Sequence, residues 1–173
     1  MYQQGEMPQY VDFPEPIIHS NDELLISVKA AGIKHLDKSR ATGKHYSAKK
    51  DIQQAKVIGG DGVGFLEDGT RVFALGVSGM IAEKAVIEKS RMVKLPDAID
   101  DAVAAALPNA VAGSAMALRF RAQMKTGEIV LINGATSFTG KIAVQIAKHY
   151  GAKKNYLHRA ESASITIINC VGR

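Results

Sequence analysis

The chain has 173 residues, of which 46% are hydrophobic and 23% are charged, and this globular composition excludes a disordered or low-complexity chain. No apolar run approaches the ~20 residues of a membrane helix, and the polar start does not resemble a signal peptide, so we expect a cytoplasmic protein with no membrane partner. The net charge is +5, of which residues 151–173 contribute +3, so the nearly neutral remainder does not indicate a nucleic-acid partner.

The first part of the chain predicts an irregular start and one clear strand. Residues 1–21 hold three of the five prolines and predict an irregular or edge-strand segment. Apolar residues then recur at every second position over 23–30, which predicts a half-buried strand. The polar stretch up to Lys56 predicts a loop with one helical turn. Four glycines within positions 59–64 indicate that the backbone there turns tightly or passes close to another segment.

Further short strands follow the glycine-rich stretch. Asp68-Gly69 is a strong turn signal before a strand over residues 71–75, so we expect a hairpin there. Two more short strands are predicted over 80–86 and 92–95. Strands at this spacing predict a small barrel or sandwich.

From residue 96 onward the pattern becomes helical. Asp101 precedes an alanine-rich run, which predicts a helix that begins there and that Pro108 ends. A second helix is predicted over about residues 110–124. We place the boundary between the barrel-like part and the α/β part within 96–127.

Residues 128–151 predict a strand, a tight turn and a helix. The apolar run over 128–133 is typical of a strand buried on both faces of a parallel sheet. In such a unit the helix N-terminus offers free N–H groups to a dinucleotide's pyrophosphate. The usual G-x-G-x-x-G motif has glycines at the places that Ala135, Ser137 and Gly140 hold here. By itself the turn leaves a nucleotide site and an ordinary strand–helix connection as equal alternatives.

Seven short blocks of the chain resemble, in order, motifs of one enzyme family. They are Ala30-Ala31-Gly32-Ile33 with Asp37, Gly59-Gly60-Asp61-Gly62-Val63-Gly64, Gly79-Met80-Ile81-Ala82-Glu83, Ala104-Ala105-Ala106-Leu107-Pro108, Gly127-Glu128-Ile129-Val130-Leu131-Ile132, Gly134-Ala135-Thr136 and Val144-Gln145-Ile146-Ala147-Lys148. Together they cover about residues 20–154. The chain thus resembles the zinc-independent, quinone oxidoreductase-like branch of the medium-chain dehydrogenase/reductase superfamily.

The resemblance implies a mixed β and α/β fold, in which a GroES-like, partly open β-barrel is followed by an incomplete Rossmann segment of parallel βα type. It implies a GroES-like catalytic domain over residues 1–108 and the start of a cofactor-binding domain over 109–154. The implied reaction is hydride transfer from NADPH or NADH to a small-molecule carbonyl, quinone or activated alkene. The family tends to form homodimers.

The resemblance also implies a set of site residues. Cofactor contacts are expected from the strand–helix turn, namely Gly134, Ala135, Ser137, Phe138, Thr139, Gly140 and Lys141. Ser114 lies where the family often places a hydroxyl beside the nicotinamide, and the alternative is a helix serine without a function. Asp37 is the candidate catalytic residue, and it either orients the substrate or caps a turn.

We expect no zinc site. Zinc-using members carry a cysteine near position 34 and a G-H-E near 59–61, where this chain has Lys34 and Gly59-Gly60-Asp61. The single cysteine, Cys170, cannot form a cysteine-based zinc site by itself. Lys34 also replaces a frequent asparagine of the family, so the family's substrate-side hydrogen bonding does not carry over at this position.

The resemblance ends at Lys154, and residues 155–173 read as an aberrant tail. A one-nucleotide shift of the codons for Asn155–Glu161 can encode Ile-Ile-Cys-Thr-Gly-Arg-Asn, which is close to the family's next strand, so we hypothesise a frameshift near Lys154. The chain is then truncated, and we expect weak or absent NADPH binding, no useful turnover, and a sheet edge at Val130 that invites aggregation. Residues 165–168 have the composition of a strand.

The alternative is a protein that is not an enzyme. In this interpretation a GroES-like module serves interaction or structure, and residues 96–173 form an appended helical arm. A barrel that is stable without cofactor affinity would favour it. The strand predicted over 128–133 argues against it, because an arm needs no buried strand.

Overall fold

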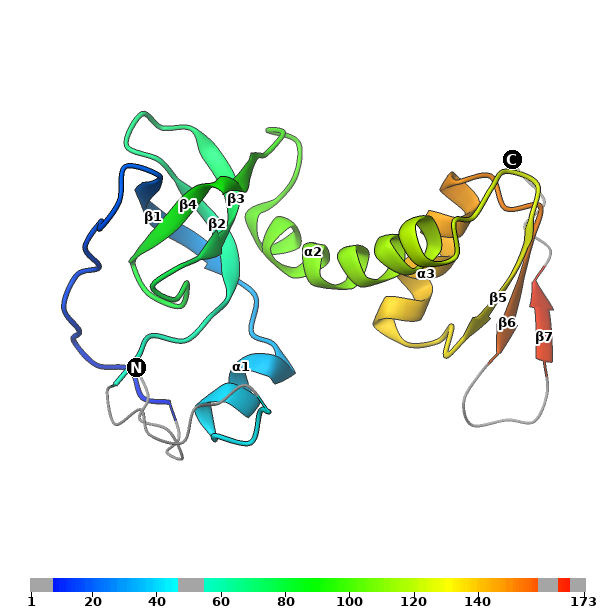
Figure 1. Ribbon diagram of the computed structural model, residues 1–173, viewed down its shortest axis with the longest axis horizontal. Coiled ribbons are helices and arrows are strands. Elements are labelled where there is room, and N and C mark those ends of the chain that lie inside the picture. Colours follow the sequence, from blue (N-terminus) through cyan, green and yellow to red (C-terminus); the bar gives the residue numbers. More distant parts are fainter. Residues whose placement is uncertain (1–7, 47–54, 159–164, 169–173) are drawn as a thin grey trace. The chain divides into compact units, whose positions relative to one another are not determined.

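The computed structural model describes residues 8–46, 55–158 and 165–168 (Figure 1). The chain forms two compact units, Met1–Ala106 and Leu107–Arg173. The boundary expected after residue 108 and the division observed here both fall within one helix, α2 (Asp101–Ala115).

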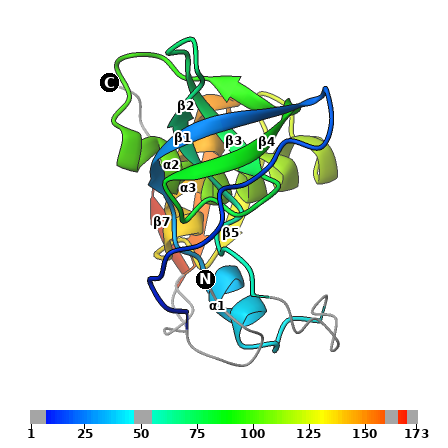
Figure 2. The same cartoon turned by 90° about the vertical axis from the view of Figure 1, so that its left-hand side faces the viewer.

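The first unit contains an antiparallel β-barrel, with β1 and β4 side by side in Figure 2. Its strands are β1 (Glu23–Ala31), β2 (Asp61–Phe65), β3 (Arg71–Gly76) and β4 (Lys84–Lys94). They pair in a closed ring, where a partly open barrel was expected. The alternation predicted over residues 23–30 is confirmed, because Ile26 is buried while Ser27 and Lys29 are exposed. The predicted hairpin at Asp68-Gly69 is also confirmed, since it joins β2 to β3.

The barrel core is apolar and tightly built. Its buried members are Ile26, Val72, Ala74, Met80, Ala85 and Ile87. A Cβ atom on Gly62 would lie 2.6 Å from the Ala30 carbonyl oxygen, and one on Gly64 would lie 2.5 Å from that of Ser27. Both positions therefore require glycine, as the close approach predicted for the glycine-rich stretch implies. The helical turn predicted before Lys56 is α1 (His35–Ala41).

The two short strands predicted over residues 80–86 and 92–95 are wrong, because β4 is one strand of 11 residues. Lys84–Glu88 pair with β1, and Ile87 and residues 92–94 pair with β3. The exposed polar residues 89–91 lie between these two groups of paired residues. Their polarity interrupts the sequence pattern without interrupting the strand.

One continuous helical segment replaces the two helices predicted between residues 101 and 124. Pro108 lies inside α2, and a π-helical segment, η1 (Met116–Arg121), follows α2 directly. The prediction that Pro108 ends a helix is wrong. Proline removes one hydrogen bond of the helix ladder, but the alanine-rich turns on either side have the highest helix propensity and continue the helix.

This segment also changes the expectation about long apolar runs. Asp101–Arg121 has 21 residues and contains an 18-residue window with a mean hydropathy of 1.2, so by length and composition it passes the test for a membrane-crossing helix. No such segment was expected from the sequence. Core helices of soluble proteins pass the same test, so the finding by itself does not indicate a membrane protein.

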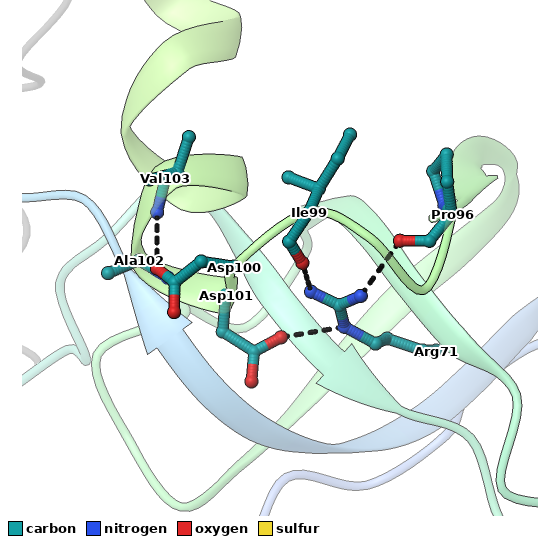
Figure 3. Close-up of polar contacts among 7 residues, drawn as sticks. All are labelled: Arg71, Pro96, Ile99, Asp100, Asp101, Ala102 and Val103. Atoms are coloured by element: carbon teal, nitrogen blue, oxygen red, sulfur yellow. Dashed lines mark hydrogen bonds and ion pairs between the residues drawn. The ribbon is translucent and has the colours of Figure 1, made fainter.

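Arg71 of β3 fixes the turn that leads into α2 (Figure 3). Its Nε–H group donates to Asp101 Oδ1 at 2.7 Å, and its two terminal nitrogens donate to the carbonyl oxygens of Pro96, at 3.0 Å, and Ile99. The Asp100 carboxylate accepts hydrogen bonds from backbone N–H groups at the start of α2. The guanidinium thus holds both the turn and the helix start to the barrel.

Replacement of Arg71 by alanine is expected to lower the free energy of unfolding by about 2 kcal/mol, because hydrogen bonds to charged groups contribute about 1.5–3 kcal/mol. Arg91→Ala is the matched control, since within the described ranges the ion-pair partner of Arg91 is Glu88 of its own strand alone. The Arg91 side chain is 60% exposed, against 15% for Arg71. We expect less than about 0.5 kcal/mol for the control. Denaturant unfolding followed by circular dichroism measures both, and equal losses would contradict the role of Arg71.

A sheet with α3 (Phe138–His149) packed against it forms the second unit. Its strands are β5 (Ile129–Asn133), β6 (Lys154–His158) and β7 (Ile165–Ile168). β5 and β6 are parallel and are joined by α3, whereas β7 is antiparallel to β6. The strand suggested by the composition of residues 165–168 is confirmed. Residues 155–158, which begin the tail where the family resemblance ends, also form a strand.

The prediction that β5 is buried on both faces is wrong. Val130 and Ile132 pack into the core beneath α3, whereas Ile129 and Leu131 are exposed on the other face. In the described part of the chain, helices cover only one side of this sheet. β5 is also the end strand of the order β5–β6–β7, so its outer edge is unpaired among the described strands, as expected.

Asn155 of β6 is a buried polar residue in an apolar layer. It is 1% exposed, and its Oδ1 atom has no hydrogen-bond partner among the described residues. It pairs in register with Val130, so its side chain lies on the face of the sheet that packs against α3. An unpartnered buried oxygen costs about 1–3 kcal/mol.

Candidate functional site

The turn between β5 and α3 brings the residues predicted for the cofactor into one loop of the second unit. Gly134 has a φ of +70°, in the left-handed region that favours glycine. The Ser137 backbone N–H group donates to the Gly134 carbonyl oxygen at 3.0 Å, and the Ser137 hydroxyl donates to the same oxygen at 2.7 Å. These two bonds close the turn.

Ser137 is the N-cap of α3. Its Oγ atom accepts a hydrogen bond from the Gly140 N–H group at 3.0 Å, which satisfies one of the donors that a helix start leaves without an intrahelical partner. The N–H groups of Phe138 and Thr139 have no acceptor in the described part of the chain. Two donors at the positive end of the helix dipole therefore remain for an anionic group.

Gly140 allows the start of α3 to pack on the turn. A Cβ atom there would overlap the Gly134 carbonyl oxygen and lie 2.7 Å from the Ala135 Cα atom. In the dinucleotide motif the third glycine serves close helix–strand packing, and this chain keeps it. Ala135 holds the place of the first glycine, and it is buried in the core of the second unit.

Three further residues predicted for the cofactor are exposed around the helix start. They are Phe138, Thr139 and Lys141. The Phe138 side chain is not packed into the core, since the residue is 58% exposed. The Lys141 ammonium forms no ion pair with the described residues, and it leaves a positive charge one turn from the free N–H groups.

Ser114 of α2 lies beside the same turn. It is buried, and its hydroxyl donates to the Thr139 carbonyl oxygen at 3.1 Å. In this structure the hydroxyl therefore supports the first turn of α3. A contact between Ser114 and a nicotinamide stays a prediction.

Asp37, the candidate catalytic residue, lies buried in α1 of the first unit. Its Oδ2 atom accepts a hydrogen bond from the Lys34 backbone N–H group at 2.8 Å, and its own N–H group donates to the Lys34 carbonyl oxygen at 3.0 Å. Of the two roles considered from the sequence, these contacts favour the capping of a turn.

Lys34 and Asp61 form an ion pair that sequence reasoning missed. The Lys34 ammonium contacts Asp61 Oδ1 at the start of β2 and donates to the Gly32 carbonyl oxygen at 3.3 Å. The two side chains are only 14% and 10% exposed. The sequence held a signal for this contact. Zinc-using members carry a cysteine near position 34 and a G-H-E near 59–61, and residues that bind one metal ion must lie close together in space.

These residues do not fit a zinc ion. An ammonium group has no lone pair to offer a metal while it is protonated, and its charge repels a cation. Across the described ranges, no group of three histidine, cysteine, aspartate or glutamate side chains could hold a metal ion.

A cavity of about 630 Å³ lies elsewhere in the first unit. It is lined by residues 8–17 and 19 on one side and by 57–58, 78 and 81–84 on the other. None of the predicted site residues lines it, so it does not enter the assignment of the cofactor turn.

Comparison with known proteins decides the family, although no protein-family profile matches the chain. The quinone oxidoreductase of Sus scrofa is 33% identical over 144 residues, which are 79% of this chain and 44% of that protein. A probable NADPH-dependent quinone reductase of Emericella nidulans is 31% identical over 179 residues, 85% of this chain and 50% of that protein. The solved quinone oxidoreductase of Thermus thermophilus has a TM-score of 0.76 and 30% identity, and the match covers 92% of this chain and 52% of that one. The chain belongs to the quinone oxidoreductase-like medium-chain dehydrogenases/reductases.

Family membership and fold class are thus as predicted. The antiparallel barrel and the parallel strand–helix–strand unit match the solved quinone oxidoreductases. The chain spans about half the length of the quinone oxidoreductases that it matches. The Thermus thermophilus quinone oxidoreductase was also solved in complex with NADPH.

Proposed function

We propose that the protein that contains this sequence is an NADPH-dependent oxidoreductase that transfers hydride to a quinone, a carbonyl or an activated alkene. The first unit is the proposed GroES-like catalytic domain, and the second is the start of the cofactor-binding domain. NADPH is preferred to NADH because a relative is named as NADPH-dependent and a solved quinone oxidoreductase binds NADPH.

The start of α3 carries this proposal. The free N–H groups of Phe138 and Thr139 would hold the pyrophosphate, and the exposed Lys141 would add an attraction for phosphate charge. Because Gly140 has no Cβ atom, the turn can pack against the helix as closely as the motif requires. NADPH, when bound, supplies the hydride, and the contribution of this chain is to bind and orient it.

For the 173-residue chain itself we propose weak NADPH binding and no turnover. The exposed apolar side chains of Ile129 and Leu131 support this proposal, because the described residues leave this face of β5 open to solvent. The unpartnered Asn155 supports the frameshift hypothesis. A one-nucleotide shift of the Asn155 codon can encode isoleucine, which suits a buried apolar layer.

The test is to resequence the gene through the codon for Lys154 and to express the restored frame. NADPH oxidation is then followed by nicotinamide absorbance, with and without a quinone. We expect quinone-dependent oxidation by the restored protein and none by the 173-residue chain. A restored protein without turnover would contradict the proposed activity, turnover by the 173-residue chain would contradict its proposed inactivity, and an unchanged frame would contradict the frameshift.

Five finer proposals accompany the activity. The enzyme is zinc-independent, cytoplasmic and homodimeric, and it has neither a nucleic-acid nor a membrane partner. The ammonium of Lys34 beside Asp61 supports the proposal of zinc independence. No observation favours the alternative of a structural module, since the parallel β5–α3–β6 unit has no evident use in a helical arm.

A further inference from the structure

Asn133 and Gly134 form the only Asn-Gly pair of the sequence, and they lie where β5 meets the turn from Gly134 to Gly140. Asparagine is chemically labile in proteins. The backbone nitrogen of the next residue can attack the carbon of its side-chain amide. This attack is easiest when the next residue is glycine, because glycine has no side chain that hinders the approach.

The Asn133 side chain is open to water. Val130 and Ile132 pack into the core beneath α3, whereas Ile129 and Leu131 are exposed on the other face of β5. Asn133 continues this second, alternating set, and it is exposed as well. Water, which a deamidation consumes, therefore reaches the amide.

The Gly134 nitrogen is not held by a hydrogen bond. Its N–H group has no acceptor in the part of the chain that the structure describes, although its carbonyl oxygen accepts two bonds from Ser137. The pairing of β5 with β6 ends at Asn133, and the φ of +70° at Gly134 turns the chain away from the strand. The nitrogen that would attack Asn133 is thus neither part of the sheet nor shielded by a side chain of its own residue.

We propose that Asn133 is a site of deamidation and that the reaction disables the turn from Gly134 to Gly140. The Gly134 nitrogen forms a bond with Cγ of Asn133, and the bond from Cγ to Nδ2 breaks. The proton of the Gly134 N–H group passes through water to the departing nitrogen, which leaves as ammonia. Water then opens the succinimide ring at either of its carbonyl carbons, so the products are an aspartyl or an isoaspartyl residue. The reaction consumes one water and releases one ammonia, without oxidation or reduction.

Both products place a carboxylate immediately before the turn. Its negative charge opposes the binding of a pyrophosphate. The isoaspartyl product also adds a methylene group to the main chain, which displaces the free N–H groups of Phe138 and Thr139. The expected loss of NADPH binding rests on the proposed function, whereas the deamidation itself does not.

Peptide mass spectrometry of the full 173-residue chain, aged in mildly alkaline buffer, tests the reaction. Asn109 is the control within the same sample, because it is also exposed but lies inside α2 and is followed by alanine. We expect Asn133 to be deamidated at least about tenfold faster than Asn109. Asn133→Gln should abolish the fast reaction, since its longer side chain does not close the same ring. Equal rates at Asn133 and Asn109 would overturn the proposal.

NADPH titrations followed by NMR test the consequence. We expect the aged wild type to lose the amide shifts of Phe138 and Thr139 in proportion to the deamidated fraction, and aged Asn133→Gln to keep them. Fresh Asn133→Asp carries the charge on a normal main chain and should show about a tenfold higher Kd. Unchanged NADPH binding by the deamidated protein overturns the proposed effect on the turn. Absence of binding by the fresh wild type overturns the proposed function, and the mass spectra still decide the deamidation.

Discussion

Gly140→Ala is expected to destabilise the second unit by about 1–3 kcal/mol, the usual cost of forcing extra atoms into a packed site. The added methyl group would overlap the Gly134 carbonyl oxygen, so either the turn or the start of α3 must move. The same movement would displace the N–H groups of Phe138 and Thr139, and we therefore expect NADPH binding to be lost. Denaturant unfolding and nicotinamide fluorescence measure the two effects.

Gly113→Ala is the matched control for this substitution. Gly113 lies inside α2, and a Cβ atom there would meet no atom within 4 Å. Alanine is favoured over glycine in a helix interior by about 0.8–1.0 kcal/mol, so this variant is expected to be as stable as the wild type or more stable. A Gly140→Ala protein that kept both stability and NADPH binding would show that the observed helix–turn packing is not required.

Asn155→Val is expected to raise the free energy of unfolding by about 1–3 kcal/mol. The substitution removes the unpartnered Oδ1 atom, whose desolvation is uncompensated, and it places an apolar side chain in the layer beneath α3. Few single substitutions stabilise a protein by this amount. Chemical denaturation of the full chain gives the difference directly.

Two further variants show whether the buried oxygen is the cause. Asn155→Asp keeps the shape and adds a buried charge, so it is expected to destabilise the chain. Asn109→Val makes the same replacement at an exposed position of α2, where asparagine and valine have similar helix propensities, and little change is expected. If Asn155→Val lowered stability, Oδ1 would have a partner, such as a bound water, in solution.

The elements with strong local signals could be predicted from the sequence. The strand around Ile26 and the hairpin at Asp68-Gly69 follow from alternation and turn chemistry, which depend on neighbouring residues. The turn from Gly134 to Gly140 was located for the same reason. Some of its contacts could not be predicted, such as the hydrogen bond from Ser114 to the Thr139 carbonyl oxygen. This bond joins positions far apart in the chain, so no local pattern indicates it.

The errors have both local and tertiary causes. Pro108 breaks an isolated helix, but one missing hydrogen bond does not outweigh the alanine-rich turns around it. The polar residues 89–91 lie within β4 between residues that pair with β1 and residues that pair with β3, and a single-strand pattern cannot show these pairings. The apolar run over 129–133 looks the same whether one face or two are covered, so the exposure of Leu131 could not be read from it.

The pair of Lys34 with Asp61 shows a different limit. Each residue was noted as a departure from the zinc-using pattern, but their contact depends on the approach of α1 to β2. Substitutions at positions that meet in a related site should be considered together, because a charge introduced at one of them needs a partner at the other.

An NMR titration of the full chain with millimolar NADPH tests the central claim most directly, because it locates the cofactor even when binding is weak. We predict that the largest amide shifts occur at Phe138 and Thr139, and that inorganic pyrophosphate shifts the same two signals. Gly140→Ala should abolish both responses. If the amide signals of residues 134–141 did not shift as the NADPH concentration rises, the assignment of this turn as the cofactor site would be contradicted. Shifts at other residues alone would have the same meaning.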